Sequence, residues 1–192
     1  MMDWDYSWTD EQIEKLNDLT RNSLICIEKS IDDKSTDIST LSWMFESSEP
    51  KTTKFDSIIN FLLDFVLESD EDTKLKEDIL YAIESAVIFQ DTSNIDFFRL
   101  ASRLSELPGD LIRASIELMS CTENLEYLSY IMLYKNHEQE NVRVWVDIAD
   151  KKLKGKKEDA EKIFNEFTKS YLGGQIFEED FKSLKFLNFF KK

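Results

Sequence analysis

The chain has 192 residues, with 39 Asp and Glu against 24 Lys and Arg, and a formal net charge of −15 at pH 7. It contains only 4 glycines and 2 prolines, well below the combined share of roughly 12 % that is usual in proteins. So few chain-breaking residues exclude Gly-rich phosphate loops and an architecture built from many hairpins. A chain of this length can bury one hydrophobic core without a metal or a disulfide.

The sequence lacks the patterns of catalytic and metal-binding sites. Its one histidine, His137, cannot build a transition-metal site, which usually needs two or more His or Cys ligands. The acidic run 69–73 has Leu75 where a calcium loop requires glycine. Cys26 and Cys121 lie on separate segments, which favours reduced, buried thiols. We therefore expect no catalytic, metal-binding or cofactor-binding residues, and a protein that is not an enzyme.

The first residues are acidic and aromatic, Met-Met-Asp-Trp-Asp-Tyr, whereas a secretory signal begins with basic residues and an apolar run. The most apolar stretch, residues 55–67, is interrupted by Asp56, Asn60 and Asp64, so it is too polar to span a bilayer. We expect a cytoplasmic protein that does not bind a membrane.

Apolar residues recur at helical spacing along the chain, and no segment alternates with the period of a β-strand. The first predicted helix begins at a capping box of Thr9 and Gln12 and includes Ile27 and Ile31 among its apolar residues. The predicted helices are 9–32, 38–45, 53–67, 69–90, 92–107, 111–121, 123–136, 142–153, 158–172 and a last amphipathic stretch over 177–187. The sequence thus predicts an all-α protein of about nine or ten helices in a single domain over 1–192.

Three of the predicted helices resemble one another. Ile79, Ala82, Ile83 and Glu84 align with Ile112, Ser115, Ile116 and Glu117, and Ile112, Arg113 and Ile116 align with Val142, Arg143 and Val146. The two offsets are 33 and 30 residues. A period of this length with two helices per unit is typical of helical repeats. The predicted units are 53–90, 92–121 and 122–154, which make a repeat core over 53–154, followed by basic C-terminal helices over 155–192.

The aligned residues resemble the second helices of HEAT repeats. That resemblance implies an α-α superhelix, in which the second helices stack side by side. An irregular orthogonal helical bundle is the alternative, because the aspartate and proline usual in HEAT turns are mostly absent. In either arrangement we expect a buried core that includes Ile59, Leu62, Ile79, Ile83, Ile112, Ile116, Leu128, Trp145 and Ile148.

The charge is distributed unevenly along the chain. Residues 1–72 carry 18 acidic and 6 basic side chains, residues 73–150 carry 14 and 7, and residues 151–192 carry 7 and 11. A field of this sign repels nucleic acid phosphates and attracts cationic partners. We expect a basic protein partner and no nucleic acid.

Two groups of residues are candidates for binding such a partner. Glu84 and Glu117 occupy equivalent places in two units, and Asp147 and Asp150 lie in the third. In a superhelix these carboxylates would form one stripe on a concave surface. The alternative is a solvated face that only keeps the protein soluble.

Trp4 and Trp8 form the second group, because they are interleaved with aspartates near the start of the chain. Tryptophans beside carboxylates suit a contact surface for a basic protein, since aromatic residues are frequent interface anchors. The alternative is that these rings hold the N-terminal arm against the helices.

A small, acidic, all-helical chain without ligands or nucleophiles is similar to the immunity proteins of bacterial toxin–immunity pairs. That resemblance implies a protein that binds and occludes a basic cognate toxin, such as a nuclease, with its carboxylates matching the toxin's Lys and Arg. It rests on composition and architecture, so it transfers no residue roles. The alternatives are a helical-repeat adaptor or regulatory scaffold for a partner protein, and an enzyme that uses paired carboxylates.

Overall fold

The computed structural model describes residues 8–171, which form nine α-helices, three short 3-10 helices and no β-strand. The longer helices are α1 (Asp10–Ile25), α2 (Ile31–Ser47), α3 (Asp56–Glu68), α4 (Thr73–Phe89), α6 (Gly109–Cys121), α8 (Glu140–Leu153) and α9 (Lys157–Tyr171). The shorter ones are α5 (Phe98–Ser102), η1 (Leu104–Glu106), η2 (Leu125–Tyr127), α7 (Leu128–Ile131) and η3 (Met132–Tyr134). The all-α prediction is confirmed for this range, and the stretch predicted over 177–187 lies outside it.

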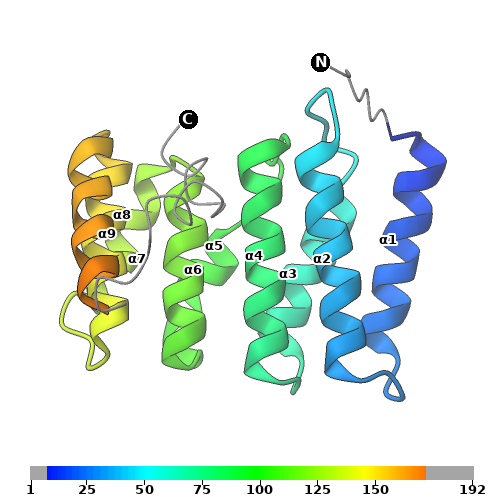
Figure 1. Cartoon of the computed structure of the whole chain (residues 1–192), viewed down its shortest axis with the longest axis horizontal. Coiled ribbons are helices and arrows are strands. Elements are labelled where there is room, and N and C mark those ends of the chain that lie inside the picture. The colour runs from blue at the N-terminus through cyan, green and yellow to red at the C-terminus, as the bar shows by residue number, and fades with distance from the viewer. Residues whose placement is uncertain (1–7, 172–192) are drawn as a thin grey trace.

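Helices α2, α4, α6 and α8 pack against one another in succession and form a row (Figure 1). They run parallel. At one end, Gln90 after α4 donates through Nε2 to the carbonyl of Phe45 in α2, at 2.5 Å. At the other end, the start of α6 at Gly109 lies against Gln139, which precedes α8.

The remaining helices cover this row. Helix α1 packs on α2, and α9 packs on α8. Helices α3, α5 and α7 contact α4, α6 and α8 respectively, so they form a second layer on one side. The pairs α3 and α4, α5 and α6, and α7 and α8 follow one another in the chain and lie one after another along the row. The order of the helices in the sequence is therefore also their order along the molecule (Figure 1).

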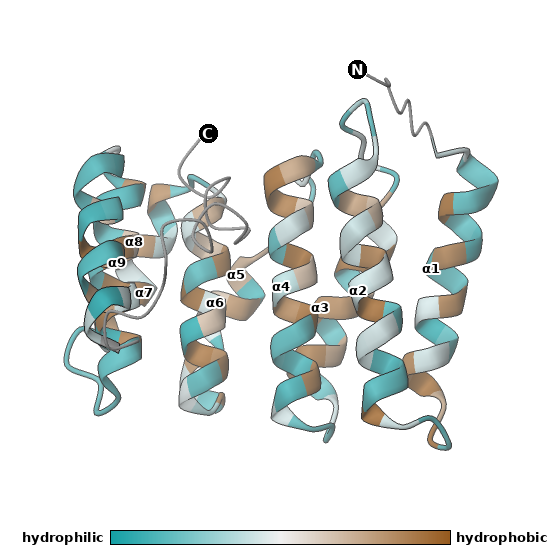
Figure 2. Cartoon of the chain, viewed as in Figure 1, coloured by the Kyte–Doolittle hydropathy of each residue, from teal (hydrophilic) through white to brown (hydrophobic). Residues whose placement is uncertain are grey.

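The core runs along the contact between the two layers. Helices α4 and α6 have a neighbour on each flank as well as the second layer, and consecutive residues are therefore buried over 82–86 and 114–120. Figure 2 shows hydrophobic residues among the hydrophilic ones on the visible side of both helices. Of the predicted core residues only Leu128, at the start of the short α7, is half-buried, and the other eight are buried.

The predicted first helix over 9–32 is wrong, because the chain turns between Ile25 and Ile31. The hydroxyl of Ser30 accepts a hydrogen bond from the backbone N–H of Asp33 at 3.3 Å, which caps the start of α2. The polar residues that follow Ile31 are therefore the first turn of α2. Ile27 lies in the turn, not on an apolar helix face.

The helices predicted over 92–107 and 123–136 are also interrupted. Side chains that bond to nearby backbone N–H groups replace the expected helical bonds: Asp96 accepts from Phe98 at 2.9 Å, and Asn124 accepts from Glu126 at 3.0 Å. Glu123 has a φ of 58°, which ends the helical path after α6. The result is the short elements α5, η1, η2, α7 and η3.

The position of Ile83 gives a direct test of this packing. Ile83 is fully buried in α4, so Ile83→Ala should lower the free energy of unfolding by about 2–5 kcal/mol through lost burial and the cavity left behind. Ile27→Ala is the control: its side chain is 95 % exposed, and the expected change is within about 0.5 kcal/mol. Urea denaturation followed by circular dichroism measures both, and equal losses would contradict the packing of α4.

Candidate functional site

A set of polar side chains connects the parallel helices inside the protein. We call it the polar ladder; its members are Ser42, Glu46, Glu84, Ser85, Glu117, Cys121 and Lys152. Between α2 and α4, the hydroxyl of Ser85 lies 2.9 Å from that of Ser42 and donates to Glu46 Oε1 at 2.9 Å. The ladder continues across α6 to α8.

Glu84 and Glu117, expected on an exposed stripe, are buried members of this ladder. Glu84 is 9 % exposed and Glu117 is 1 % exposed. The predicted exposure is wrong because α4 and α6 each have a helix on both flanks, so equivalent positions on successive helices meet inside the row. These two carboxylates cannot contact a partner on this surface.

Arg113 on α6 balances part of this buried negative charge. Its Nη1 donates to Glu117 Oε2 at 2.9 Å, and its Nη2 donates to Tyr81 Oη at 2.7 Å and to Glu77. Although burial opposes its charge, these neighbouring oxygens raise the pKa of Arg113, so the guanidinium stays protonated. Arg113 thus ties the start of α6 to α4.

Glu117 itself is not fully compensated. Burial, together with the charge of Glu84, raises the pKa of Glu117 well above its usual value, against the opposing effect of Arg113. Its second oxygen, Oε1, is buried and has no hydrogen-bond partner in the described part of the chain. A buried carboxylate in this state favours protonation.

Cys121 joins α4 to α8. Its thiol donates to Glu84 Oε1 at 3.4 Å, and Lys152 Nζ donates to its Sγ at 3.3 Å. Burial, and then the charge of Glu84, raises the pKa of the Cys121 thiol. A thiol of raised pKa is a poor nucleophile, so this cysteine acts as a packing and hydrogen-bonding group.

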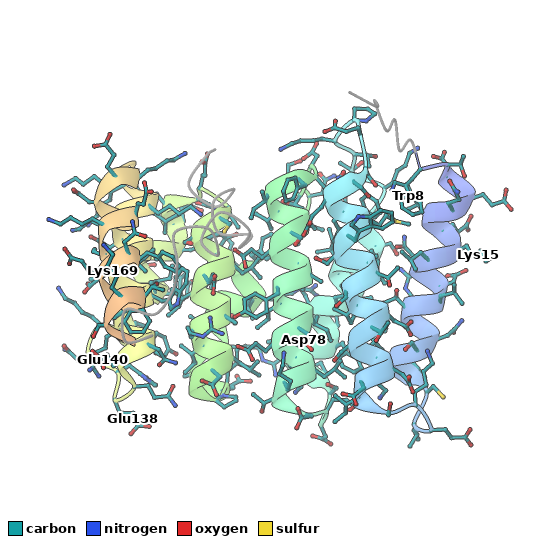
Figure 3. The ribbon with its side chains drawn as sticks, in the orientation of Figure 1. Trp8, Lys15, Asp78, Glu138, Glu140 and Lys169 are labelled. Carbon is teal, nitrogen blue, oxygen red and sulfur yellow. The ribbon has the colours of Figure 1, made fainter. Side chains whose placement is uncertain are left out.

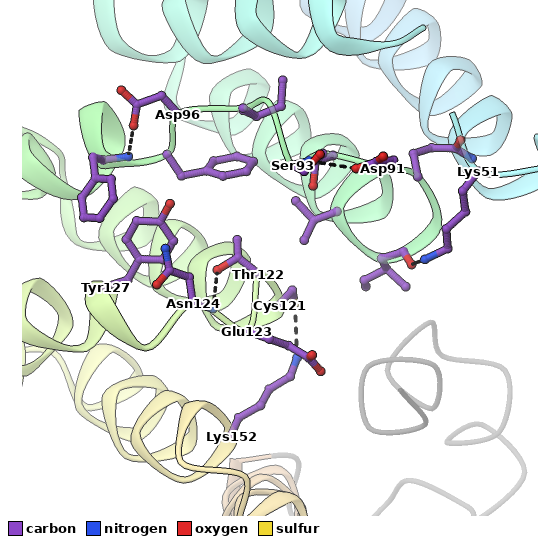
Figure 4. Close-up of a pocket in the computed structure, with 17 residues that line it drawn as sticks. Lys51, Asp91, Ser93, Asp96, Cys121, Thr122, Glu123, Asn124, Tyr127 and Lys152 are labelled. Carbon is purple, nitrogen blue, oxygen red and sulfur yellow. Dashed lines mark hydrogen bonds between the residues drawn. The ribbon is translucent and has the colours of Figure 1, made fainter. Parts of the chain in front are cut away.

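A cavity of about 910 Å³ opens beside Cys121, at the carboxyl ends of α4, α6 and α8 (Figure 4). Lysines and carboxylates both line it: Lys51, Asp91, Asp96, Glu123 and Lys152. Several of these groups already bond to the walls of the cavity. Lys51 Nζ donates to the carbonyl of Ile88 at 3.3 Å, and hydrogen bonds from Ser93 lower the pKa of Asp91.

The lining of the cavity holds no metal-binding group among the described residues. Its one thiol is the hydrogen-bonded Cys121, and across residues 8–171 no group of three or more His, Cys, Asp or Glu side chains could hold a metal ion. The cavity is lined by side chains of both charges and by aromatic rings such as Phe98 and Tyr127, whose centroids lie 4.8 Å apart.

Trp8 packs onto α2. Its Nε1 donates to the hydroxyl of Ser47 at 3.0 Å, and its ring meets the edge of Trp43 with centroids 5.3 Å apart. Figure 3 shows Trp8 between the start of α1 and α2. Of the two interpretations, these contacts support the one in which the ring holds the start of α1 in place. Trp4 lies outside the described residues.

The two aspartates of the third unit differ in their surroundings. Asp147 is exposed on α8. Asp150 accepts from Lys154 Nζ at 2.5 Å and lies 3.3 Å from Lys151 Nζ, and the hydrogen bond from Lys154 lowers its pKa. Asp147 is therefore the one predicted stripe carboxylate that is open to solvent, and the structure does not bring it together with Glu84 and Glu117 on one surface.

The sequence interpretation missed an exposed apolar group at the turn between α1 and α2. Ile25, Ile27 and Ile31 are 66 %, 95 % and 40 % exposed, and Leu19 on α1 is 54 % exposed. The spacing of Ser30 and Asp33, a helix-capping pattern, would have placed a helix start there and removed Ile27 from the predicted apolar face.

Comparisons with known protein families, with curated proteins and with solved structures find no match. Within residues 8–171, no helix combines the length and the apolar character needed to cross a bilayer.

The buried Glu117 predicts a pH-dependent stability. Because the folded pKa is raised above the unfolded value of about 4.3, the native state holds this proton to higher pH than the unfolded chain does. The contribution of Glu117 to the free energy of unfolding is complete below the unfolded pKa and decreases as pH rises toward the folded pKa. Glu117→Gln should remove the decrease, so the free energy of unfolding of the variant relative to the natural chain should increase with pH.

Urea denaturation at a series of pH values from about 4 to 8 measures this difference. Glu138→Gln, at an exposed position, is the matched control and should leave the profile unchanged. Parallel profiles for the natural chain and Glu117→Gln would contradict the interpretation.

The two thiols should differ in reactivity. Cys26 lies in the turn after α1, whereas Cys121 is hydrogen-bonded between Glu84 and Lys152 and its pKa is raised by burial. In the native protein at neutral pH, Ellman's reagent should label Cys26 at least about tenfold faster than Cys121, since only the thiolate reacts. In the Cys26→Ser variant only slow labelling should remain until urea is added. Rapid labelling of that native variant would show that Cys121 is accessible.

Proposed function

We propose that this chain is an immunity-type protein, which binds a basic toxin such as a nuclease and occludes it. The observation that carries the proposal is the separation of charge along the row of helices. Chain order is spatial order over the described residues, so the excess of carboxylates in residues 8–72, 16 acidic against 6 basic, lies around α1, α2 and α3.

A field concentrated at one end of an elongated molecule steers a positively charged protein toward that end. Residues 151–171 carry 7 basic and 4 acidic side chains and lie at the end of α8 and in α9, at the other end of the row. This opposite charge gives an approaching partner an orientation as well as an attraction. The same field opposes binding of nucleic acid. An enzyme that acts on nucleic acid and carries a basic active-site surface has the complementary charge.

We also propose that the row is a HEAT-like α-α superhelix, with α2, α4, α6 and α8 as second helices. Their parallel succession supports this assignment, as does the second layer of α3, α5 and α7. Such an array exposes long surfaces and its two end helices, which are the parts available to a partner.

The second candidate is a helical-repeat adaptor that holds a segment of a partner protein. The cavity at the carboxyl ends of α4, α6 and α8 favours it, since its polar and aromatic walls suit an extended peptide. Binding in that cavity would depend on shape and hydrogen bonds and only weakly on salt.

The charge-based proposal predicts a salt-dependent association rate. The proposal expects a basic protein to be encoded by the neighbouring gene, and that protein is the probe. The readouts are suppression of its toxicity on co-expression and stopped-flow association rates. The rate constant should decrease at least about tenfold between low and physiological salt, because screening limits the field to about 8 Å at physiological ionic strength. Glu11→Lys with Glu14→Lys, both exposed on α1, should slow association without unfolding the protein.

The matched control is Glu138→Lys with Glu140→Lys, which makes the same change in net charge at exposed positions near the other end of the row (Figure 3). It should slow association less than the α1 variant does. Association that is indifferent to salt and to both reversals, or protection against no toxin, would favour the adaptor.

A further inference from the structure

We infer that the turn between α1 and α2 is a docking surface for a basic protein partner that inserts apolar side chains flanked by Lys and Arg. We call this surface the isoleucine corner; its members are Ile25, Ile27 and Ile31. The inference rests on the proposed function and specifies which surface carries it.

The local fold forces these side chains outward. Helix α1 ends where the N–H of Cys26 donates to the carbonyl of Asn22 at 3.0 Å, and α2 begins at the Ser30 cap. The short turn between them leaves Ile27 95 % exposed and Ile25 66 % exposed. Figure 2 shows hydrophobic residues at this end of α1 and α2. Exposed apolar residues gathered in one short turn mark interaction sites more often than isolated ones do.

The basic groups nearest the corner are held by acceptors of the chain itself. Lys29 Nζ lies 2.6 Å from Asp37 Oδ2 and donates to Ser23 at 3.2 Å. Arg21 donates to Ser57 at 2.6 Å and lies over the ring of Phe61, so its guanidinium is directed toward α3. The two basic side chains nearest the turn in the described chain are therefore occupied by its own acceptors.

The carboxylates of the corner, unlike these basic groups, have no ion-pair partner among the described residues. Glu28 and Asp32 are exposed, and neither forms an ion pair with any other residue of the described range. Glu28 follows Ile27 in the chain, and Asp32 follows Ile31. The corner therefore combines exposed isoleucines with unpaired carboxylates that neighbour them in the chain, and we take these carboxylates as its rim.

This combination identifies the occupant. Protein interfaces place apolar anchors in a desolvated centre and polar groups at the rim, and complementary charges at the rim favour one partner over others. A second copy of the chain would place Glu28 and Asp32 against the same carboxylates across the interface, which like-charge repulsion opposes. A basic partner turns the same rim into an attraction.

The probe for a first test is a synthetic amphipathic helical peptide with leucines on one face and lysines and arginines on the other. A scrambled peptide of the same composition is its control. Titration calorimetry should show that the full-length protein binds the amphipathic peptide more tightly than the scrambled one. Nuclear magnetic resonance shifts should change most at the isoleucine corner.

Two variants separate the apolar centre from the rim. Ile27→Asp should weaken binding at least about tenfold, as loss of an interface anchor does. Glu28→Lys with Asp32→Lys should weaken binding and reduce its dependence on salt. Leu133→Asp is the matched control, since Leu133 on η3 is 78 % exposed and far along the chain, and its affinity should stay within about twofold of the natural protein. Ile27 and Leu133 are both exposed, so thermal unfolding should show that these variants remain folded.

Three outcomes would overturn the inference. Equal affinity of Ile27→Asp and the natural protein for the peptide would show that the peptide binds elsewhere. Chemical-shift changes confined to residues around the cavity of Figure 4 would identify that cavity as the binding site. Self-association that strengthens with salt and is lost in Ile27→Asp would make the corner an interface between copies of this chain. Full toxin suppression by Ile27→Asp, with loss of suppression in Glu11→Lys with Glu14→Lys, would leave the proposed function intact and remove the corner from it.

Discussion

The parallel packing of α2, α4, α6 and α8 is the constraint on which the rest of the structure depends. A helix in the middle of this row has a neighbour on each flank and the second layer against a third side. Such a helix can be solvated over only a small part of its circumference, and its residues must be small or apolar where backbones approach. Ala82 and Ala86 on α4 and Ala114 on α6 meet that requirement.

The parallel packing also explains why charged side chains such as Glu84 and Glu117 are buried between the helices of the row. The polar ladder costs desolvation energy, and an apolar interior could be equally stable. Its physical consequence is a fixed register. A slip of α6 along α4 by one turn would separate Arg113 from Glu77 and Tyr81 and leave buried charges without partners. The Lys152–Cys121–Glu84 contacts impose the same requirement on α8.

The row also decides which charges can reach a partner. Carboxylates on the flanks of middle helices are buried, whereas those on the end helices and turns remain in solvent. The first turn of α2 and the turn before it belong to the second group, and there exposed isoleucines and unpaired carboxylates occur together. A partner that bound at an end of the row would use a surface that packing leaves free, and the register of the interior helices would be unaffected.

Helical periodicity and the scarcity of glycine and proline determined that residues 8–171 are all-α, and they identified core residues such as Ile59, Ile83 and Ile148. Composition determined the net charge and its uneven distribution along the chain. Periodicity alone predicted longer helices than the structure has. The side chains of Ser30, Asp96 and Asn124 accept hydrogen bonds from nearby backbone N–H groups, and these local bonds compete with the helical ones.

Only the tertiary structure decided that Glu84 and Glu117 are buried while Ile27 is exposed. A pattern along one helix shows which side is apolar, but it does not show how many neighbours cover the remaining sides. That number depends on whether the helix lies in the middle of the row or at its end, and contacts between residues far apart in the chain decide it.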